Sequence, residues 1–253
     1  MIARLQPISL EELTSQAAML TRVDRKYAMT AEDAAEVLAE LPETTRVLSM
    51  GGRRGFSYES YYFDTPDLLS FRMAALGRRR RFKLRTRSYV DSADAFLELK
   101  TRGARSATVK ERIEYGFDDR EELTDEGREY AVEGLGALGI PDPDGLELRP
   151  TLATRYRRTT LLAPEGGGRA TIDTALSWEL ADGTSMALPD LVIVETKSGQ
   201  RTGDIDRLLW RHGIRPSTIS KYGTGLAALR PDLPRNKWAR VLRRRFHPAG
   251  VAA

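Results

Sequence analysis

Residues 81–90, RFKLRTRSYV, alternate between cations and apolar or small side chains. Cations occupy positions 81, 83, 85 and 87, and Phe82, Leu84 and Thr86 lie between them. Successive side chains of a β-strand point to opposite faces, so this stretch predicts one face with a row of cations and one face that packs on a core. Like charges on one face repel each other. The row therefore faces either water or a strongly anionic ligand.

The same alternation recurs in most of the other stretches that we expect to form strands. In residues 95–102, AFLELKTR, Glu98 and Lys100 share one face and Leu97 shares the other with Leu99. Charged and apolar residues also alternate in RVDRKY (22–27), TVKERIEYGF (108–117), RATIDTAL (169–176) and LVIVETKSG (191–199). The commonest cause of such a pattern is a sheet with one solvated face. The alternative is a sheet closed into a barrel, with its polar faces inside.

A barrel interior lined by cations is stable only if it holds water and anions, because unpaired buried charge is costly. Most of these stretches also carry a carboxylate two residues from a cation. The cations suit phosphate oxygens, and the carboxylates suit a divalent metal ion, which prefers oxygen ligands. The pattern thus favours a polyanion bound together with a divalent cation.

The composition excludes several classes of site. The chain has 253 residues, a formal net charge of +4 and no Cys, so disulfides, thiolate metal sites and a Cys nucleophile are excluded. Only two His are present, His212 and His247, which disfavours a His-rich metal site and a Ser-His-Asp hydrolase. No run approaches the ~20 apolar residues that span a membrane, and the first residues lack the apolar core of a signal peptide. We expect a cytoplasmic protein.

Capping and periodicity predict a mixed α and β chain. Helices are expected at about 9–20, 30–41, 64–74, 120–138, 203–213, from 220 onwards and in 235–250. Strands are expected at about 21–29, 44–50, 56–63, 78–90, 94–102, 107–117, 150–162, 168–176 and 190–198. No linker is long enough to separate domains. This order indicates an α+β fold with a large antiparallel sheet or barrel.

Nine segments occur in an order that is typical of one family: RVDRKY, YYFDTPDL, KLRTRSY, FLELKT, VKER, RYRRTTLL, RATIDT, VIVETKSG and SKYGTGL. They run from residue 22 to about 226. The chain resembles the VTC domain, the polyphosphate polymerase domain of the triphosphate tunnel metalloenzyme (CYTH-like) superfamily. The resemblance implies a closed antiparallel β-barrel, the triphosphate tunnel fold, with peripheral helices. It places one VTC-like domain at 1–230 and a basic C-terminal tail at 231–253.

The resemblance also implies an activity, in which the ATP γ-phosphate is transferred to a growing polyphosphate chain. It implies phosphate binding by Lys26, Lys83, Arg85, Arg87, Lys100, Lys110, Arg112, Tyr156, Arg158, Arg169, Lys197, Ser220 and Lys221. Of these we expect Lys26, Arg85, Arg87, Lys100, Arg158 and Lys221 to be catalytic. The expected cofactor is Mn²⁺ or Mg²⁺, with Glu195 and Glu98 as its ligands. Phosphoryl transfer requires charge neutralisation and in-line placement more than a nucleophilic side chain.

The sequence differs from the family pattern at two positions, and two other functions are compatible with the same residues. Asp24 occupies a position where the family more often has Glu, and Thr218 stands where the eukaryotic polymerases have a basic residue. The same lining would serve a tripolyphosphatase or nucleoside triphosphatase, and it would also serve a non-catalytic polyphosphate-binding module. The expected ligands are ATP or another triphosphate and polyphosphate, and no nucleic acid is expected.

The phosphate-sensing domain and membrane helices of the eukaryotic polymerases have no counterpart in this sequence. Export of a polymer would therefore need a membrane-protein partner, and a peripheral location at the inner membrane face would be compatible with one. The basic residues of 235–246, with Trp238 and Phe246, form an amphipathic segment. It could bind an acidic membrane surface or polyphosphate, or be a solvated helix packed through Trp238 and Val241.

Overall fold

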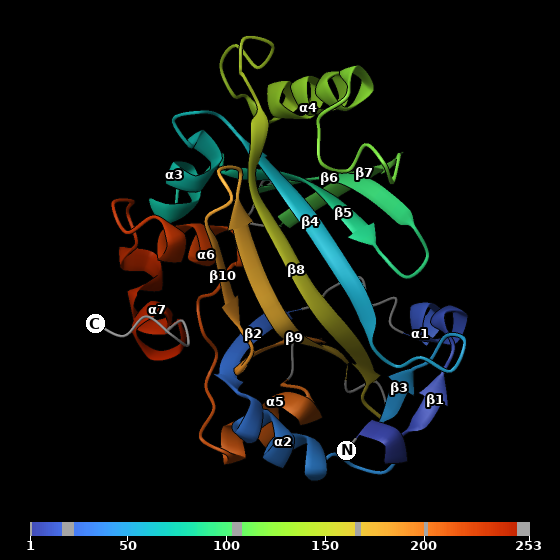
Figure 1. Ribbon diagram of the computed structural model, residues 1–253. Coiled ribbons are helices and arrows are strands. Elements are labelled where there is room, and N and C mark those ends of the chain that lie inside the picture. The colour runs from blue at the N-terminus through green and yellow to red at the C-terminus, as the bar shows by residue number, and fades with distance from the viewer. Residues whose placement is uncertain (1, 17–22, 103–107, 165–167, 200–201, 247–253) are drawn as a thin grey trace.

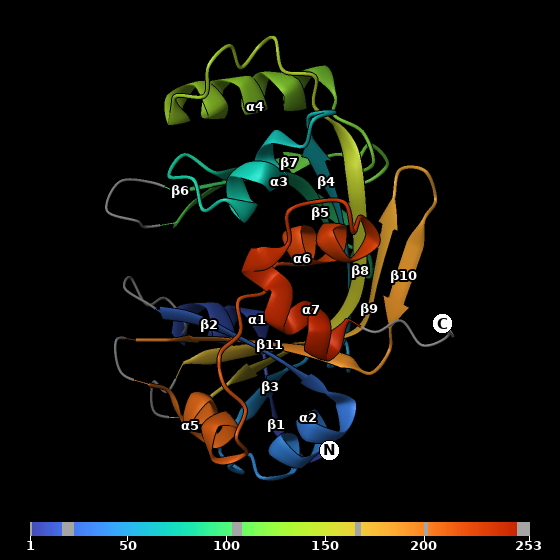
Figure 2. The same ribbon diagram turned by 90° about the vertical axis from the view of Figure 1, so that its left-hand side faces the viewer.

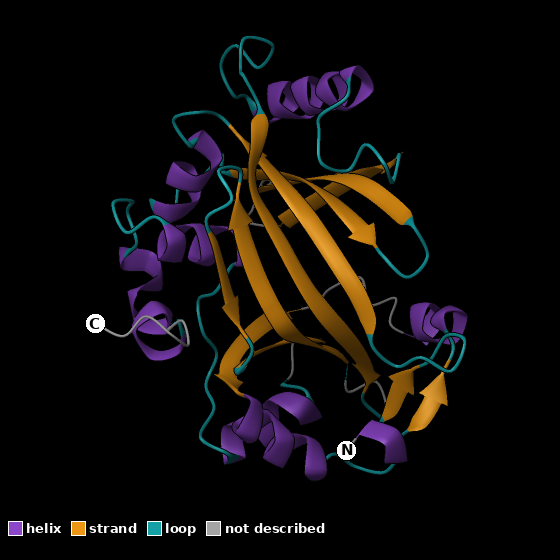
Figure 3. Ribbon diagram, in the orientation of Figure 1, coloured by secondary structure: helices purple, strands orange, loops and turns teal. Residues whose placement is uncertain are grey.

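The computed structural model describes residues 2–16, 23–102, 108–164, 168–199 and 202–246 (Figure 1). One large and mainly antiparallel sheet forms its centre, and helices pack around it (Figure 3). The strands of its main path lie in the order β2 (Val23–Thr30), β11 (Leu191–Ser198), β9 (Arg169–Leu180), β8 (Arg149–Leu162), β4 (Phe56–Asp64), β5 (Phe82–Tyr89), β6 (Asp94–Arg102) and β7 (Thr108–Tyr115). The predicted α+β class is confirmed.

The sheet is strongly curved, so that its two ends face each other across a concave surface. Figure 2 shows β5, β6 and β7 above, β2 and β11 below, and the long strands β4, β8 and β9 between them. The hydrogen-bonded path ends at β2 and at β7 in the described residues, so the predicted closed barrel is not confirmed.

Helices cover the outer face of the sheet and supply its core. Helix α4 (Asp125–Leu138) buries Ala131 and Leu135 against Leu97 and Leu99 of β6. At the other end, α2 (Ala31–Ala39) and α5 (Asp204–Arg211) pack on the apolar residues of β2 and β11. The alternation in the sequence is therefore resolved as predicted, with the apolar rows under helices and the charged rows on the concave face.

Three further helices lie against one side of the concave face: α3 (Leu69–Ala75), α6 (Lys221–Leu229) and α7 (Ala239–Arg245). In Figure 2, α6 and α7 lie between the upper and lower parts of the sheet. Among the helices of the described residues, none is long and apolar enough to cross a membrane.

Several element bounds differ from those predicted. Strands β1 (Gln6–Ile8) and β3 (Arg46–Leu48) form a parallel pair between segments that are far apart in the chain. The short strand β10 (Ser185–Leu188) forms a hairpin with the preceding strand β9, and neither β1 nor β10 was predicted. Helix α4 begins at Asp125 rather than near 120, because the Thr124 side chain caps it by accepting from the Gly127 amide. Helix α1 (Leu10–Gln16) matches the expected first helix, and residues 17–22 lie outside the described residues.

A buried carboxylate fixes α6 relative to the sheet. Asp64, at the end of β4, accepts hydrogen bonds from the amides of Ser70 and Phe71 and from the Tyr222 hydroxyl. Burial raises the pKa of Asp64, although these hydrogen bonds act against that effect. Because Tyr222 lies in the first turn of α6, this contact also positions Ser220 and Lys221 at the start of the helix.

Trp238 holds the segment after α6 in place by packing against that helix. Trp238, in the 3₁₀ turn η3 (Asn236–Trp238), is 2 % exposed and packs against Gly223 of α6. A Cβ atom added at Gly223 would lie 2.4 Å from the Trp238 ring. Glycine at this position is therefore required by the close approach of helix and ring.

We expect Gly223→Ala to lower the free energy of unfolding by about 2 kcal/mol, because either the ring or the helix must move. Gly136→Ala is the matched control within helix α4, where the added Cβ would lie 3.7 Å from its nearest neighbour. That substitution should be neutral or stabilise by up to ~1 kcal/mol, since Ala favours helix over Gly. Urea unfolding of both variants measures the difference, and equal effects would contradict this packing.

Candidate functional site

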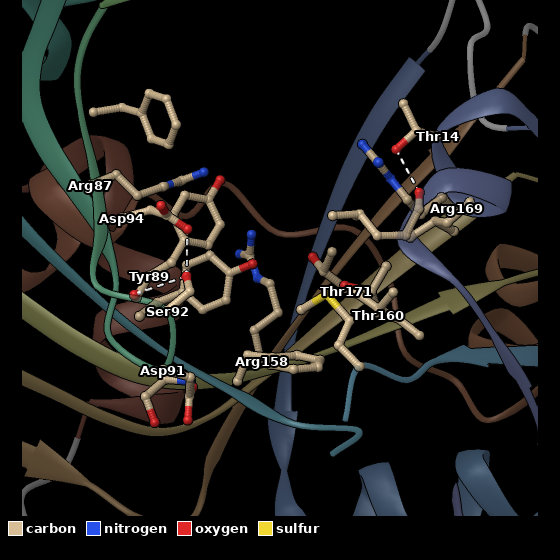
Figure 4. A pocket seen from close by; sticks show the side chains of 18 of the residues that line it. Thr14, Arg87, Tyr89, Asp91, Ser92, Asp94, Arg158, Thr160, Arg169 and Thr171 are labelled. Atoms are coloured by element: carbon tan, nitrogen blue, oxygen red, sulfur yellow. Dashed lines mark hydrogen bonds between the residues drawn. The ribbon is translucent and has the colours of Figure 1, made fainter. Parts of the chain in front are cut away.

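The concave face encloses a cavity of about 1080 Å³. Arg87 and Arg169 enter it from opposite sides, with Arg158 between them (Figure 4). The predicted site residues in its lining are Arg87, Lys100, Lys110, Arg112, Arg158, Arg169, Glu195 and Lys197. Residues from strands at both ends of the sheet therefore meet around one space.

A second cavity, of about 260 Å³, lies between β5, β6, η3, the last turn of α3 and the segment Thr218–Ser220 before α6. Lys100 lines both cavities. The other predicted site residues in the second lining are Lys83 and Ser220, whose side chains are 2.9 Å apart (Nζ to Oγ). Arg81, Arg102 and Lys237 complete its basic lining, in which the described residues include no Asp or Glu.

The strand register places like charges side by side. Lys83 of β5 lies directly opposite Lys100 of β6, which lies opposite Lys110 of β7. Arg85 and burial lower the pKa of Lys100 to about 5, and burial with the nearby Lys26 lowers the pKa of Lys83 to about 7. Such a row of lysines is unfavourable without an anion. It indicates a surface arranged for a ligand of high negative charge.

Glu98 is the counter-ion of the cations on the upper strands. It is 0 % exposed, and its carboxylate lies 2.7 Å from the Arg85 guanidinium, 2.6 Å from Lys110 Nζ and 3.9 Å from Arg87. Burial acts to raise the pKa of Glu98, but Arg85 and Arg87 outweigh it and hold the pKa far below its usual range. With three cationic partners, Glu98 organises the basic lining. Its predicted role as a metal ligand stays a prediction.

Asp173 on β9 is, like Glu98, a buried counter-ion of several cations. It lies opposite Arg158 of β8, which donates to both of its carboxylate oxygens at 2.6 and 2.8 Å, and Lys221 of α6 also donates to it. Burial would raise the pKa of Asp173, but Lys221 and Arg158 lower it to about 2. This carboxylate thus joins the first turn of α6 to the sheet.

Glu195 lies at the lower end of the main cavity. Its carboxylate is 3.2 Å from Lys26 Nζ, directly opposite on β2, and 2.9 Å from Lys197 Nζ. Burial acts to raise the pKa of Glu195, but Lys26 and Lys197 hold it well below its usual range. Lys197 also donates to Asp24 at 3.0 Å. An ionised carboxylate that faces an anion-binding cavity has the donor chemistry that a hard divalent cation needs.

Aromatic rings lie beneath several of the cations. Arg87 and Arg158 lie 6.0 and 5.1 Å from the Tyr58 ring centre, and Arg112 lies 4.3 Å from that of Phe96. Arg85 donates to the Tyr62 hydroxyl at 2.9 Å. A ring attracts a cation without neutralising it. The rings thus hold these arginines without adding to the neutralisation that Glu98 and Asp173 already provide to Arg85 and Arg158.

Five predicted residues line neither cavity: Lys26, Arg85, Tyr156, Lys221 and Glu98. Arg85 is 7 % exposed and Tyr156 4 %, so both are packed behind the lining. Lys221 lies over the Tyr156 ring, with its Nζ 4.2 Å from the ring centre. The sequence did not place Tyr58 or Tyr62 in the site, and it assigned Lys237 only to the basic tail that could bind polyphosphate or a membrane surface. The alternating positions 58, 60 and 62 of β4 were a signal for the tyrosines, but no local signal placed Lys237.

The chain is similar, at low sequence identity, to several proteins of solved structure. It is 17 % identical to a putative adenylyl cyclase from Hippeastrum that is described as having a dominant triphosphatase activity, covering 85 % of this chain and 99 % of that one with a TM-score of 0.49. A conserved hypothetical protein from Pyrococcus furiosus (16 %) and the PH1012 protein from Pyrococcus horikoshii (12 %) each match over 77 % of this chain and 92 % of theirs, with a TM-score of 0.41. No curated protein sequence matches the chain.

A family comparison gives a result that covers most of the chain. The sequence model of the VTC domain matches residues 21–230, which include every predicted site residue. The ordered motifs, the curved sheet and its basic concave face agree with that match. The chain belongs to the VTC domain family.

Proposed function

We propose that this protein is a polyphosphate polymerase-type enzyme that transfers the γ-phosphate of ATP to a growing polyphosphate chain. The observation that carries the proposal is the pair of basic cavities that share Lys100. A triphosphate has room in the larger cavity, and a product chain has room in the smaller one, whose described lining has no carboxylate to repel it. A hydrolase has no need for the second space.

The lining residues supply the chemistry of this proposal. Arg87, Arg158 and Arg169 would neutralise the phosphate oxygens and hold the chain end in line with the γ-phosphorus. A guanidinium is a planar fork of N–H donors that matches two phosphate oxygens. Arg158 already donates two of its N–H groups to Asp173, so only its remaining donors would contact a phosphate. Because phosphoryl transfer depends on placement and charge stabilisation, the site needs no nucleophilic side chain.

A divalent cation fits this donor set through Glu195. In the described part of the chain no group of three or more His, Cys, Asp and Glu could hold a metal ion by itself. Mg²⁺ commonly binds through one or two carboxylates together with substrate phosphates, so one ionised carboxylate at the cavity suffices. When bound, the ion would neutralise charge that develops on the transferred phosphoryl group. Lys26 and Lys197 would keep Glu195 ionised and oriented.

Phosphorus NMR of the protein with ATP and Mg²⁺ tests the activity, and reactions with Mn²⁺ are followed on samples from which the metal has been chelated. We expect an internal-chain phosphate signal to grow with time. Glu195→Gln and Arg87→Met should each reduce its rate by at least ~10-fold, as expected for loss of a charge-assisted contact of ~1.5–3 kcal/mol. Arg149→Met, at a surface cation paired with Glu147 outside both cavities, should leave the rate unchanged. Orthophosphate alone would show a hydrolase, and an unchanged spectrum would show a binding module.

Binding of a polyphosphate chain that is long enough to enter the second cavity should be accompanied by proton uptake, because Lys83 lines that cavity. Lys83 is partly neutral near pH 7 in the free protein, since its pKa is about 7. A nearby phosphate favours the charged lysine, so its pKa rises on binding and a proton enters from solution. Calorimetry in buffers of different ionisation enthalpy should show an uptake above pH ~7 that Lys83→Met reduces. The difference should vanish as the pH falls well below 7, where Lys83 is already protonated. Identical uptake in both proteins would contradict the burial of this lysine at the ligand.

A further inference from the structure

A residue beyond the family-matched part of the chain contributes to the second cavity. The VTC domain match ends at residue 230, whereas Lys237 and Trp238 of η3 line this cavity beside Arg81 and Arg102. The segment after the matched region is thus part of the wall and not only a tail.

The position of Lys237 is fixed by its neighbours. Trp238 packs against Gly223 and against the Phe71 ring, whose centre is 5.6 Å from its own. Lys237 Nζ donates to the carbonyl oxygen of Ala74 in the last turn of α3, where a cation is favoured by the helix dipole. That bond uses one of the three N–H donors of the ammonium group, so two are left for a ligand.

The electrostatics at this position favour an anion. Burial and the nearby Arg81 and Arg102 lower the pKa of Lys237, so the three cations act on one another. Lys83 and Lys100 belong to the same lining and are less exposed than Lys237. A chain of phosphates is the ligand class that could contact the inner lysines and the outer cations at the same time, since it carries a charge on every unit.

We propose that Lys237 binds phosphates of a chain that is longer than a triphosphate and thereby sets the preference of this protein for long chains. This inference rests on the proposed function, because it assumes that a triphosphate group occupies the larger cavity. Phosphates beyond that group would then lie in the second cavity, between Lys100 and the outer cations. A triphosphate alone would not reach Lys237.

Titration calorimetry with two probes tests this: inorganic tripolyphosphate and a size-fractionated polyphosphate several times longer. Lys237→Met keeps the side-chain stem over Trp238 and removes the charge. We expect it to weaken binding of the long chain about fivefold, the value for a partly exposed charge contact, and to leave tripolyphosphate binding unchanged. Arg240→Met, an exposed cation of α7 that is not in the lining of either cavity, is the matched control and should change neither affinity.

Three results would overturn the inference: equal weakening for both probes, no weakening for the long chain, or the same weakening in the Arg240 variant. Equal weakening in the Arg240 variant would show that the tail binds polyphosphate only through its net positive charge and not through the position of Lys237. Failure of the proposed function is distinguishable, because the unsubstituted protein would then not bind tripolyphosphate or would not turn over ATP. If it binds both probes and Lys237→Met discriminates between them, the chain-length role holds even for a protein that only binds polyphosphate.

Discussion

Repulsion among the cations of the concave face is the constraint on which the rest of this structure depends. Lys83, Lys100 and Lys110 lie side by side across three strands, where like charges destabilise a sheet. Buried carboxylates offset the repulsion around them: Glu98 on the upper strands and Asp173 on β9. Loss of one partner of a buried ion pair commonly costs about 3–5 kcal/mol, because the other charge is left uncompensated. These carboxylates therefore stabilise the fold and organise the site together.

The buried carboxylates neutralise only part of the positive charge of the concave face, and the charge that remains can attract an anionic ligand. Tyr58 and Phe96 hold arginines by cation–π contacts and leave their charge in place. In the second cavity the described lining has no carboxylate at all. The remaining positive potential is the physical basis for binding a polyanion, and a ligand that supplied the missing charge would also stabilise the folded state by mass action.

Much of the site was readable in the sequence because a strand has a period of two. Alternation assigned Lys100 and Glu98 to one face and Leu99 to the other before any pairing was known. The ordered motifs identified the family and most of the cations that line the larger cavity. The depth of each residue could not be read in this way: Arg85 and Arg87 are two positions apart on one face, yet only Arg87 lines a cavity. Tyr62 packs over Arg85, and Tyr62 comes from another strand.

The sequence by itself determined the α+β class, the faces of the strands and the basic character of the concave surface, since these follow from local periodicity and composition. Tertiary structure decided which charges became partners. The pairs Arg85 with Glu98 and Lys26 with Glu195 follow from strand register, which depends on packing across the whole sheet. It also decided that the hydrogen-bonded path of the described residues ends at β2 and at β7, and that Lys237 joins a cavity lined by β5 and β6. Both depend on contacts between residues far apart in the chain, which no local pattern encodes.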